Sequence, residues 1–131
     1  MIIALQSAGI AFLSFHTLSI PGRTTGVMRT TVVSPFTVDG SRYILSFGDL
    51  SWVRNARAAG WGNLGRGRST RKVGLVEVES PAKDAVVREF PRQIPAGVQF
   101  FVRSGLVQKP GTADQFSAAA DRLTLFRIEP K

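Results

Sequence analysis

The dipeptide Asp39-Gly40 is the strongest turn signal in this sequence. An Asp-Gly pair favours the tight two-residue turn that joins antiparallel strands, because both positions of that turn take a positive φ. The pair separates Arg29–Val38, a run rich in Thr, Val and Phe, from Arg42–Phe47. Both runs carry side chains that suit a pleated surface. We therefore expect a β-hairpin over residues 29–47.

Other segments continue this pattern of short strands separated by turns. Trp61–Arg66 and Thr70–Glu79 are expected to form a second hairpin, with Gly67 in its turn. Phe15–Ile20 and Leu123–Ile128 alternate along their length and are expected to be strands. Antiparallel pairs need only short connections, whereas parallel pairs need long crossovers. The sequence therefore predicts a mainly β fold, an antiparallel barrel.

Helices are expected around the edge of this barrel. Gly48 breaks the strand before it, and Asp49 or Ser51 can cap a helix. That helix runs to about Ala59, where Gly60 suits its C-terminal end. The other expected helices cover residues 2–13, 81–90, 95–106 and 113–120. A chain of 131 residues is one domain by its length, so residues 1–131 are expected to form a single domain that begins with an apolar helix within residues 1–14.

The composition excludes several kinds of chemistry. The sequence has no cysteine, so it has no disulfide and no thiolate nucleophile or ligand. It has one histidine, His16, whereas a zinc site needs several His, Cys or carboxylate ligands. We therefore expect no metal site, and we expect His16 to be a packed or hydrogen-bonded strand residue.

The first fifteen residues, Met1–Phe15, contain no charged residue. A membrane-spanning helix needs about 20 apolar residues, so this run is too short to be one. A secretory signal would begin with basic residues, which are missing here. Two interpretations stay open, a helix packed on the core or on a partner subunit and a helix resting on a membrane surface. The expected location is the cytoplasm, with membrane association through this segment as the alternative.

Positive charge is concentrated in one part of the chain. The net charge is +8, and residues 21–72 hold nine basic and two acidic residues, which leaves +7 there. Such a region is expected to meet an anion. Nucleic acid is not the expected partner, because the aromatic residues are not interleaved with the arginines as base stacking would require.

The segment Pro21–Arg29 has the composition of a phosphate-binding turn. Its glycines permit a tight loop, and successive backbone N–H groups in such a loop can form a concave anion site. Thr24 and Thr25 add hydroxyl donors, while Arg23 and Arg29 add guanidinium groups suited to phosphate. By itself the pattern is equally compatible with a solvated loop.

Several nearby residues also have a structural interpretation. Trp52 can be a core anchor, and Asn55 can satisfy buried backbone groups. Arg54 and Arg57 can form a solvated helix face, and Glu77 with Glu79 an exposed strand face. These alternatives stay open at this point.

Four stretches carry a resemblance to a known family. They are Pro21–Gly26, Arg29–Thr31, Asp39-Gly40 followed by Tyr43, and the helix Ser51–Gly60. Together they resemble the deazaflavin-dependent nitroreductases of actinobacteria, with Trp-Val-Arg-Asn in the helix as the most specific part. The resemblance implies an antiparallel split β-barrel, like that of the flavin reductases and the pyridoxamine-phosphate oxidases. It also implies coenzyme F-420 as the cofactor, with FMN as the alternative.

The resemblance assigns roles to thirteen residues. The phosphate side would be contacted by Arg23, Thr24, Thr25, Gly26 and Arg29. The ring would be lined by Thr31, Val32, Val33, Ser46, Phe47 and Gly48, and Trp52 and Asn55 would close or support the pocket. The family usually has a basic residue and then Ser at positions 24 and 25, and Pro at position 32; this chain has Thr, Thr and Val.

The resemblance implies an oxidoreductase that passes a hydride from the reduced deazaflavin to a small electron-poor acceptor, such as a quinone, a nitro compound or an activated alkene. The catalytic residue and proton donor are not identified by the sequence. A non-catalytic carrier of a lipid or cofactor on the same barrel is the alternative, with Phe100 and Phe101 facing an apolar tunnel. The chain is expected to be a monomer or a homodimer.

Overall fold

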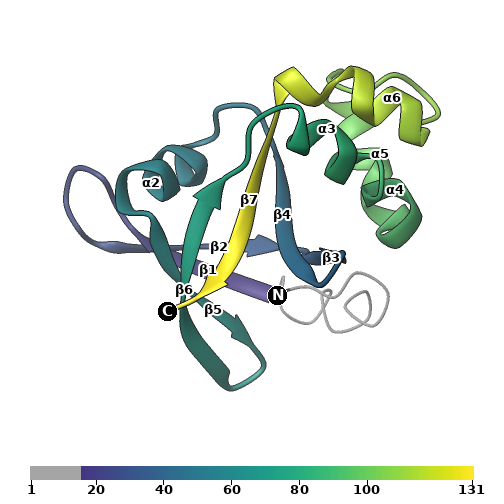
Figure 1. Cartoon of the computed structure of the whole chain (residues 1–131). Coiled ribbons are helices and arrows are strands. Elements are labelled where there is room, and N and C mark those ends of the chain that lie inside the picture. The colour runs from purple at the N-terminus through teal and green to yellow at the C-terminus, as the bar shows by residue number, and fades with distance from the viewer. Residues whose placement is uncertain (1–15) are drawn as a thin grey trace.

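The computed structural model describes residues 16–131, and its centre is a curled seven-stranded sheet (Figure 1). The sheet order is β2-β1-β5-β6-β7-β4-β3, and every pair of neighbours is antiparallel. The strands are β1 His16–Pro21, β2 Met28–Val33, β3 Phe36–Val38, β4 Ser41–Phe47, β5 Trp61–Arg66, β6 Ser69–Glu77 and β7 Leu123–Pro130. The predicted antiparallel barrel is thereby confirmed. The expected helix over residues 2–13 lies outside the described residues.

Both predicted hairpins are present. Asp39 and Gly40 take φ values of 50° and 82° and turn β3 into β4, with Val38 opposite Ser41. Gly67, with φ 61°, lies in the turn between β5 and β6. The single strand expected over residues 29–38 was wrong. It is divided into β2 and β3 at Ser34 and Pro35, because proline has no N–H with which to continue a ladder.

Two helical parts accompany the sheet. The helix α2, Ser51–Ala59, packs against β1, β5 and β6 and ends at Gly60, as predicted. A cap of short helices follows β6, comprising α3 Ala82–Val87, α4 Phe90–Gln93, α5 Val98–Arg103 and α6 Ala113–Ala118, with 3-10 turns η1 Pro95–Gly97 and η2 Ala120–Arg122. In Figure 1 the cap gathers at one end of β4 and β7, while α2 lies apart from it beside β6. None of these helices is long and apolar enough to cross a bilayer.

The expected single helix over residues 95–106 was also wrong. It is divided into η1 and α5, and α5 ends at Arg103, shortly before Gly105 with φ 82°. The helix expected to stop before Pro91 does so, since α3 ends at Val87. Pro91 then lies in the first turn of α4, where its missing N–H costs no hydrogen bond.

The strands β4 and β7 are buried on both faces. On one face Ile44 and Phe126 enter the barrel core, which also holds Val53 and Ala56 of α2. On the other face Leu45 and Leu125 enter the cap core. One antiparallel pair, in register from Arg42 opposite Ile128 to Phe47 opposite Leu123, is thus the wall between two cores.

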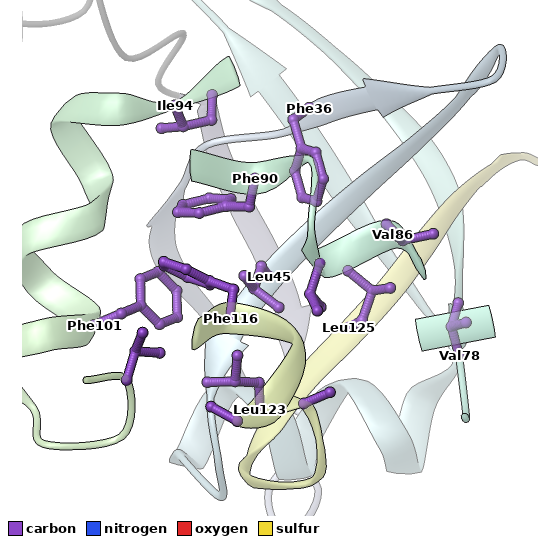
Figure 2. Close-up of a cluster of buried hydrophobic side chains, with 14 residues drawn as sticks. Phe36, Leu45, Val78, Val86, Phe90, Ile94, Phe101, Phe116, Leu123 and Leu125 are labelled. Carbon is purple, nitrogen blue, oxygen red and sulfur yellow. The ribbon is translucent and has the colours of Figure 1, made fainter. Parts of the chain in front are cut away.

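A group of aromatic rings, Phe36, Phe90, Phe101 and Phe116, lies together within the cap core, as Figure 2 shows. Phe90 lies within 5.5 Å of the rings of Phe36, Phe101 and Phe116, measured between centroids. Phe101 also stacks edge-on against Phe47 of β4 at 4.7 Å. Such pairs add to the free energy gained from burial alone. The rings therefore join the cap helices to β4.

Neighbouring phenylalanines provide a matched test of this core. Phe101 is 6% exposed and Phe100 is 47% exposed. Phe101→Ala should lower the free energy of unfolding by about 3–5 kcal/mol, because it leaves a cavity in the ring cluster. Phe100→Ala should change it by no more than about 0.5 kcal/mol. Urea unfolding of both variants checks this, and equal losses would contradict the packing described here.

Candidate functional site

The loop between β1 and β2 is a closed turn. The N–H of Gly22 donates to the carbonyl of Val27 at 2.8 Å, and the N–H of Gly26 donates to the carbonyl of Gly22 at 2.8 Å. Gly26 has φ 77°, a value that glycine adopts at little cost. The hydroxyl of Thr25 accepts from the N–H of Val27 at 3.2 Å. These bonds give the loop one defined shape.

Asn55 of α2 holds this loop through two hydrogen bonds. Its Oδ1 accepts from the backbone N–H of Arg23 at 3.1 Å and from the Arg23 guanidinium at 2.8 Å. The same guanidinium donates to the carbonyl of Ser51 at 3.4 Å. Asn55 is only 5% exposed, so its orientation is fixed by packing. Both acceptors are neutral, so Arg23 is positioned without an ion pair to any residue in the described part of the chain.

Two groups of backbone donors in this region have no partner within the described chain. One group is the N–H pair of Thr24 and Thr25, which no hydrogen bond of the loop uses. The other is the first turn of α2, whose N-cap, Leu50, makes no side-chain capping bond. Free N–H groups at the start of a helix, together with its dipole, favour an anion.

The expectation that Asp49 or Ser51 caps α2 was wrong. The carboxylate of Asp49 instead accepts from Arg54 at 2.9 Å and from Arg57 at 3.4 Å. The hydrogen bond from Arg54 lowers the pKa of Asp49. Arg57 also makes a two-pronged pair with Glu77, at 2.8 and 2.9 Å. The arginines on this face of α2 are exposed, as the interpretation of a solvated helix face proposed, and they are also paired with carboxylates, which the sequence did not predict.

A polar pocket of about 580 Å³ opens between the loop and α2. Its lining residues are Gly22, Arg23, Thr24, Thr25, Arg29, Thr31, Ser51, Trp52 and Asn55. Arg29 makes no ion pair with any residue in the described part of the chain. No carboxylate is among the described residues that line the pocket, and both arginines face it without an ion pair to any of these residues.

An apolar pocket of about 250 Å³ adjoins the polar one, and the two share Thr31 and Trp52. It lies between β2, β4, the start of α2 and the cap. Its lining residues are Thr31, Val32, Val33, Ser34, Leu45, Ser46, Phe47, Leu50, Trp52, Phe90, Ile94, Gly97, Phe100 and Phe101. Trp52 also packs on Phe126 at 5.8 Å between ring centroids, so it is at once a core residue and a pocket wall.

The structure brings together eleven of the thirteen residues predicted for the site. The two pockets are lined by Arg23, Thr24, Thr25, Arg29, Thr31, Val32, Val33, Ser46, Phe47, Trp52 and Asn55. Gly26 shapes the loop without lining either pocket. Gly48 lies elsewhere, because its N–H donates to Arg122 and its carbonyl accepts from Thr124, which holds it against η2 and β7.

The sequence indicated only some of the cap residues that line the apolar pocket. Phe90, Ile94, Gly97 and Phe101 follow one another at spacings of four, three and four, which is the period of one helical face. That signal was available in the sequence. It did not show which strand the face would meet, because this depends on the path of the chain from β6 through the cap.

No model of a known protein family and no curated protein matches this sequence. Solved structures do match the fold. A domain-swapped dimer is 14% identical, with 97% of this chain and 96% of that chain covered and a TM-score of 0.60. An F-420-H2 dependent reductase is 13% identical, with 88% and 93% covered and a TM-score of 0.58. A FAD-binding protein from Mesorhizobium loti is 14% identical, with 98% and 89% covered and a TM-score of 0.55.

At these identities the similarity establishes the fold. The neighbours share the antiparallel split barrel, so the fold implied by the sequence resemblance is confirmed. The match to the F-420-H2 dependent reductase is consistent with the family resemblance. The neighbours include proteins of different cofactors, so the choice of cofactor depends on the site itself.

The bond from Asn55 to the loop can be tested directly. Asn55→Ala removes the acceptor for two donors of Arg23 and should lower the free energy of unfolding by about 1–3 kcal/mol. The amide of Arg23 should then exchange its hydrogen faster, which NMR measures residue by residue. Asn63→Ala on β5 is the control, since its side chain makes no hydrogen bond with the described residues. Unchanged exchange at Arg23 would show that Asn55 does not hold the loop.

Proposed function

We propose that this protein is a deazaflavin-dependent oxidoreductase, which passes a hydride from reduced coenzyme F-420 to a small electron-poor acceptor. The observation that carries the proposal is the pair of adjoining pockets. One is cationic and rich in backbone donors, and the other is apolar, and they meet at Thr31 and Trp52. A coenzyme with a phosphate-bearing tail and a flat ring suits these pockets, with the tail in the cationic one and the ring in the apolar one.

The polar pocket suits the phosphate end. The guanidinium groups of Arg23 and Arg29 can donate to phosphate oxygens, and such charge-assisted hydrogen bonds are among the strongest available to a protein. The N–H groups of Thr24 and Thr25 and those of the first turn of α2, which have no partner among residues 16–131, add fixed dipoles. Because Asn55 already orients Arg23, little side-chain freedom is lost on binding.

The apolar pocket suits the ring. When bound, the coenzyme supplies the hydride, and the protein orients the ring and excludes water. Val33 and Phe101 are buried walls of this pocket, while Thr31 and Ser46 bring hydroxyl groups to it. No carboxylate, lysine or histidine is among its lining residues in the described chain. The chain therefore offers binding and positioning at the ring, with hydroxyls or water to carry protons.

FMN is the alternative cofactor, since it also joins a phosphate to an isoalloxazine ring. The acceptor classes we propose are quinones, nitro compounds and activated alkenes, all of which can take up a hydride and then a proton. The F-420-H2 dependent reductase among the structural neighbours supports the deazaflavin, and the FAD-binding neighbour supports a flavin.

Coenzyme titration tests the proposal. Oxidised F-420 should bind saturably, followed by its fluorescence, and Arg29→Ala should weaken binding by roughly 1.5–3 kcal/mol, or about ten- to a hundredfold. Arg68→Ala removes the same charge from the β5–β6 turn, outside both pockets, and should have little effect. Absence of saturable binding at tens of micromolar would refute the deazaflavin, and FMN titrated in parallel decides between the two cofactors.

A non-catalytic carrier is the second candidate, and one observation favours it. Three exposed apolar side chains surround the apolar pocket, namely Val32, Leu50 and Phe100. Such a rim suits an apolar guest such as a lipid chain. Native mass spectrometry of the purified protein should then show a retained lipid, and reduced coenzyme should not be oxidised when a quinone is added. Steady turnover with the quinone would exclude a purely carrier role.

A further inference from the structure

A second group of basic side chains lies at the opposite end of the barrel. His16, Arg42, Arg66 and Arg71 come from β1, β4, β5 and β6. Each lies two residues from a member of the barrel core, namely Leu18, Ile44, Leu64 and Val73. Since alternate residues of a strand share a face, these four side chains lie on the same face of their strands as the barrel core, near one end of each strand. We call them the basic mouth.

The basic mouth surrounds a cavity of about 380 Å³. The cavity is lined by His16, Arg42, Leu64, Arg66, Ser69, Thr70 and Arg71, and none of these is acidic. Nη2 of Arg42 lies 3.4 Å from Nε2 of His16. A guanidinium can only donate, so the imidazole nitrogen is the acceptor. This contact spans β1 and β4, which are not neighbours in the sheet, and brings the two sides of the mouth together.

Like charges are held together here without a compensating carboxylate. Burial lowers the pKa of Arg42, and the nearby charges of Arg71 and Arg66 lower it further. Glu129 lines an adjoining cavity with Arg42 and Arg71, but its carboxylate is bonded by Arg127 at 2.7 Å. The segment before His16 contains no acidic residue in its sequence, so it cannot supply the missing charge.

The mouth is separate from the coenzyme pockets. His16 begins β1 and Pro21 ends it, next to the loop that holds Arg23. A six-residue strand is about 17 Å long, so the two sites lie at opposite ends of the same strand. They share no lining residue.

We propose that the basic mouth binds a small phosphorylated molecule through a phosphate group with two or more negative charges. Three guanidinium groups around one cavity can form several charge-assisted bonds to phosphate oxygens. The site is concave and inward-facing, which suits a small ligand more than a membrane surface. Apart from the ring of His16, no aromatic side chain is among its lining residues within residues 16–131, so the described part of the site offers no platform for stacked bases.

Inorganic pyrophosphate is the probe that tests this site in the full-length protein. In a phosphate-free buffer, NMR titration should move the amide signals of His16, Ser69 and Thr70 along a saturable curve. Signals of Thr24 and Thr25 report any binding at the coenzyme loop separately, so the two sites are distinguished within one experiment.

Three charge-removing variants complete the test. Arg42→Gln and Arg71→Gln should each raise the dissociation constant read from the mouth signals by about tenfold or more. Arg68→Gln, on the same hairpin as Arg71 but outside the cavity, should raise it less than about threefold. A thermal melt confirms folding, and Arg71→Gln alone decides the matter if Arg42→Gln does not fold.

Three results would overturn the proposal. The first is an absence of saturable shifts at the mouth with millimolar pyrophosphate. The second is an equal loss of pyrophosphate affinity in all three variants, which would indicate diffuse surface charge. The third is Arg42- and Arg71-dependent sedimentation with phosphatidic acid vesicles without any pyrophosphate binding. That result would replace the small molecule by a lipid head group.

Discussion

The pairing of β4 with β7 is the constraint on which the remaining structure depends. Both strands are buried on two faces, so Ile44 and Leu45 enter different cores although they are adjacent in sequence. Breaking this wall would expose the barrel core and the cap core together. The apolar pocket lies where the end of β4 meets the cap, and Phe47 serves both, as a ring partner of Phe101 and as a pocket wall. The pocket thus exists because two cores share one wall.

The helix α2 connects that scaffold to the polar pocket. Val53 and Ala56 are fully buried in the barrel core, and this fixes the rotation of the helix. With that rotation set, Asn55 reaches the loop at Arg23, and Arg54 points to Asp49. The carboxylate of Asp49 therefore binds arginines on the outer side of the helix and does not cap its first turn. The N–H groups of the first turn therefore have no partner in the described part of the chain, because the packing of Val53 and Ala56 fixes the rotation of the helix.

The sequence was most informative where local chemistry decides the structure. Asp39-Gly40 requires positive φ values and forms the expected turn, and Gly60 ends α2 where the sequence predicted. Gly48 could not be placed, because its position depends on bonds to Arg122 and Thr124, far along the chain. The basic region from residue 21 to 72 also looked uniform in sequence. In three dimensions it divides into paired arginines on α2, loop arginines that make no ion pair with the described residues, and the basic mouth.

The loop shows how a missing charge can be replaced in part by geometry. A basic residue at position 24 would add one full positive charge, whereas Thr24 adds only a hydroxyl; the backbone N–H, which has no partner in the described chain, would be present with either residue. Backbone dipoles are weaker than a charge at a distance, but they are fixed in place and need no ordering of a long side chain. Affinity at this loop should thus rest more on its closed shape than on long-range attraction. For the proposed phosphate site, the bonds that close the loop, from Gly22 to Val27 and from Arg23 to Asn55, therefore matter alongside the arginines.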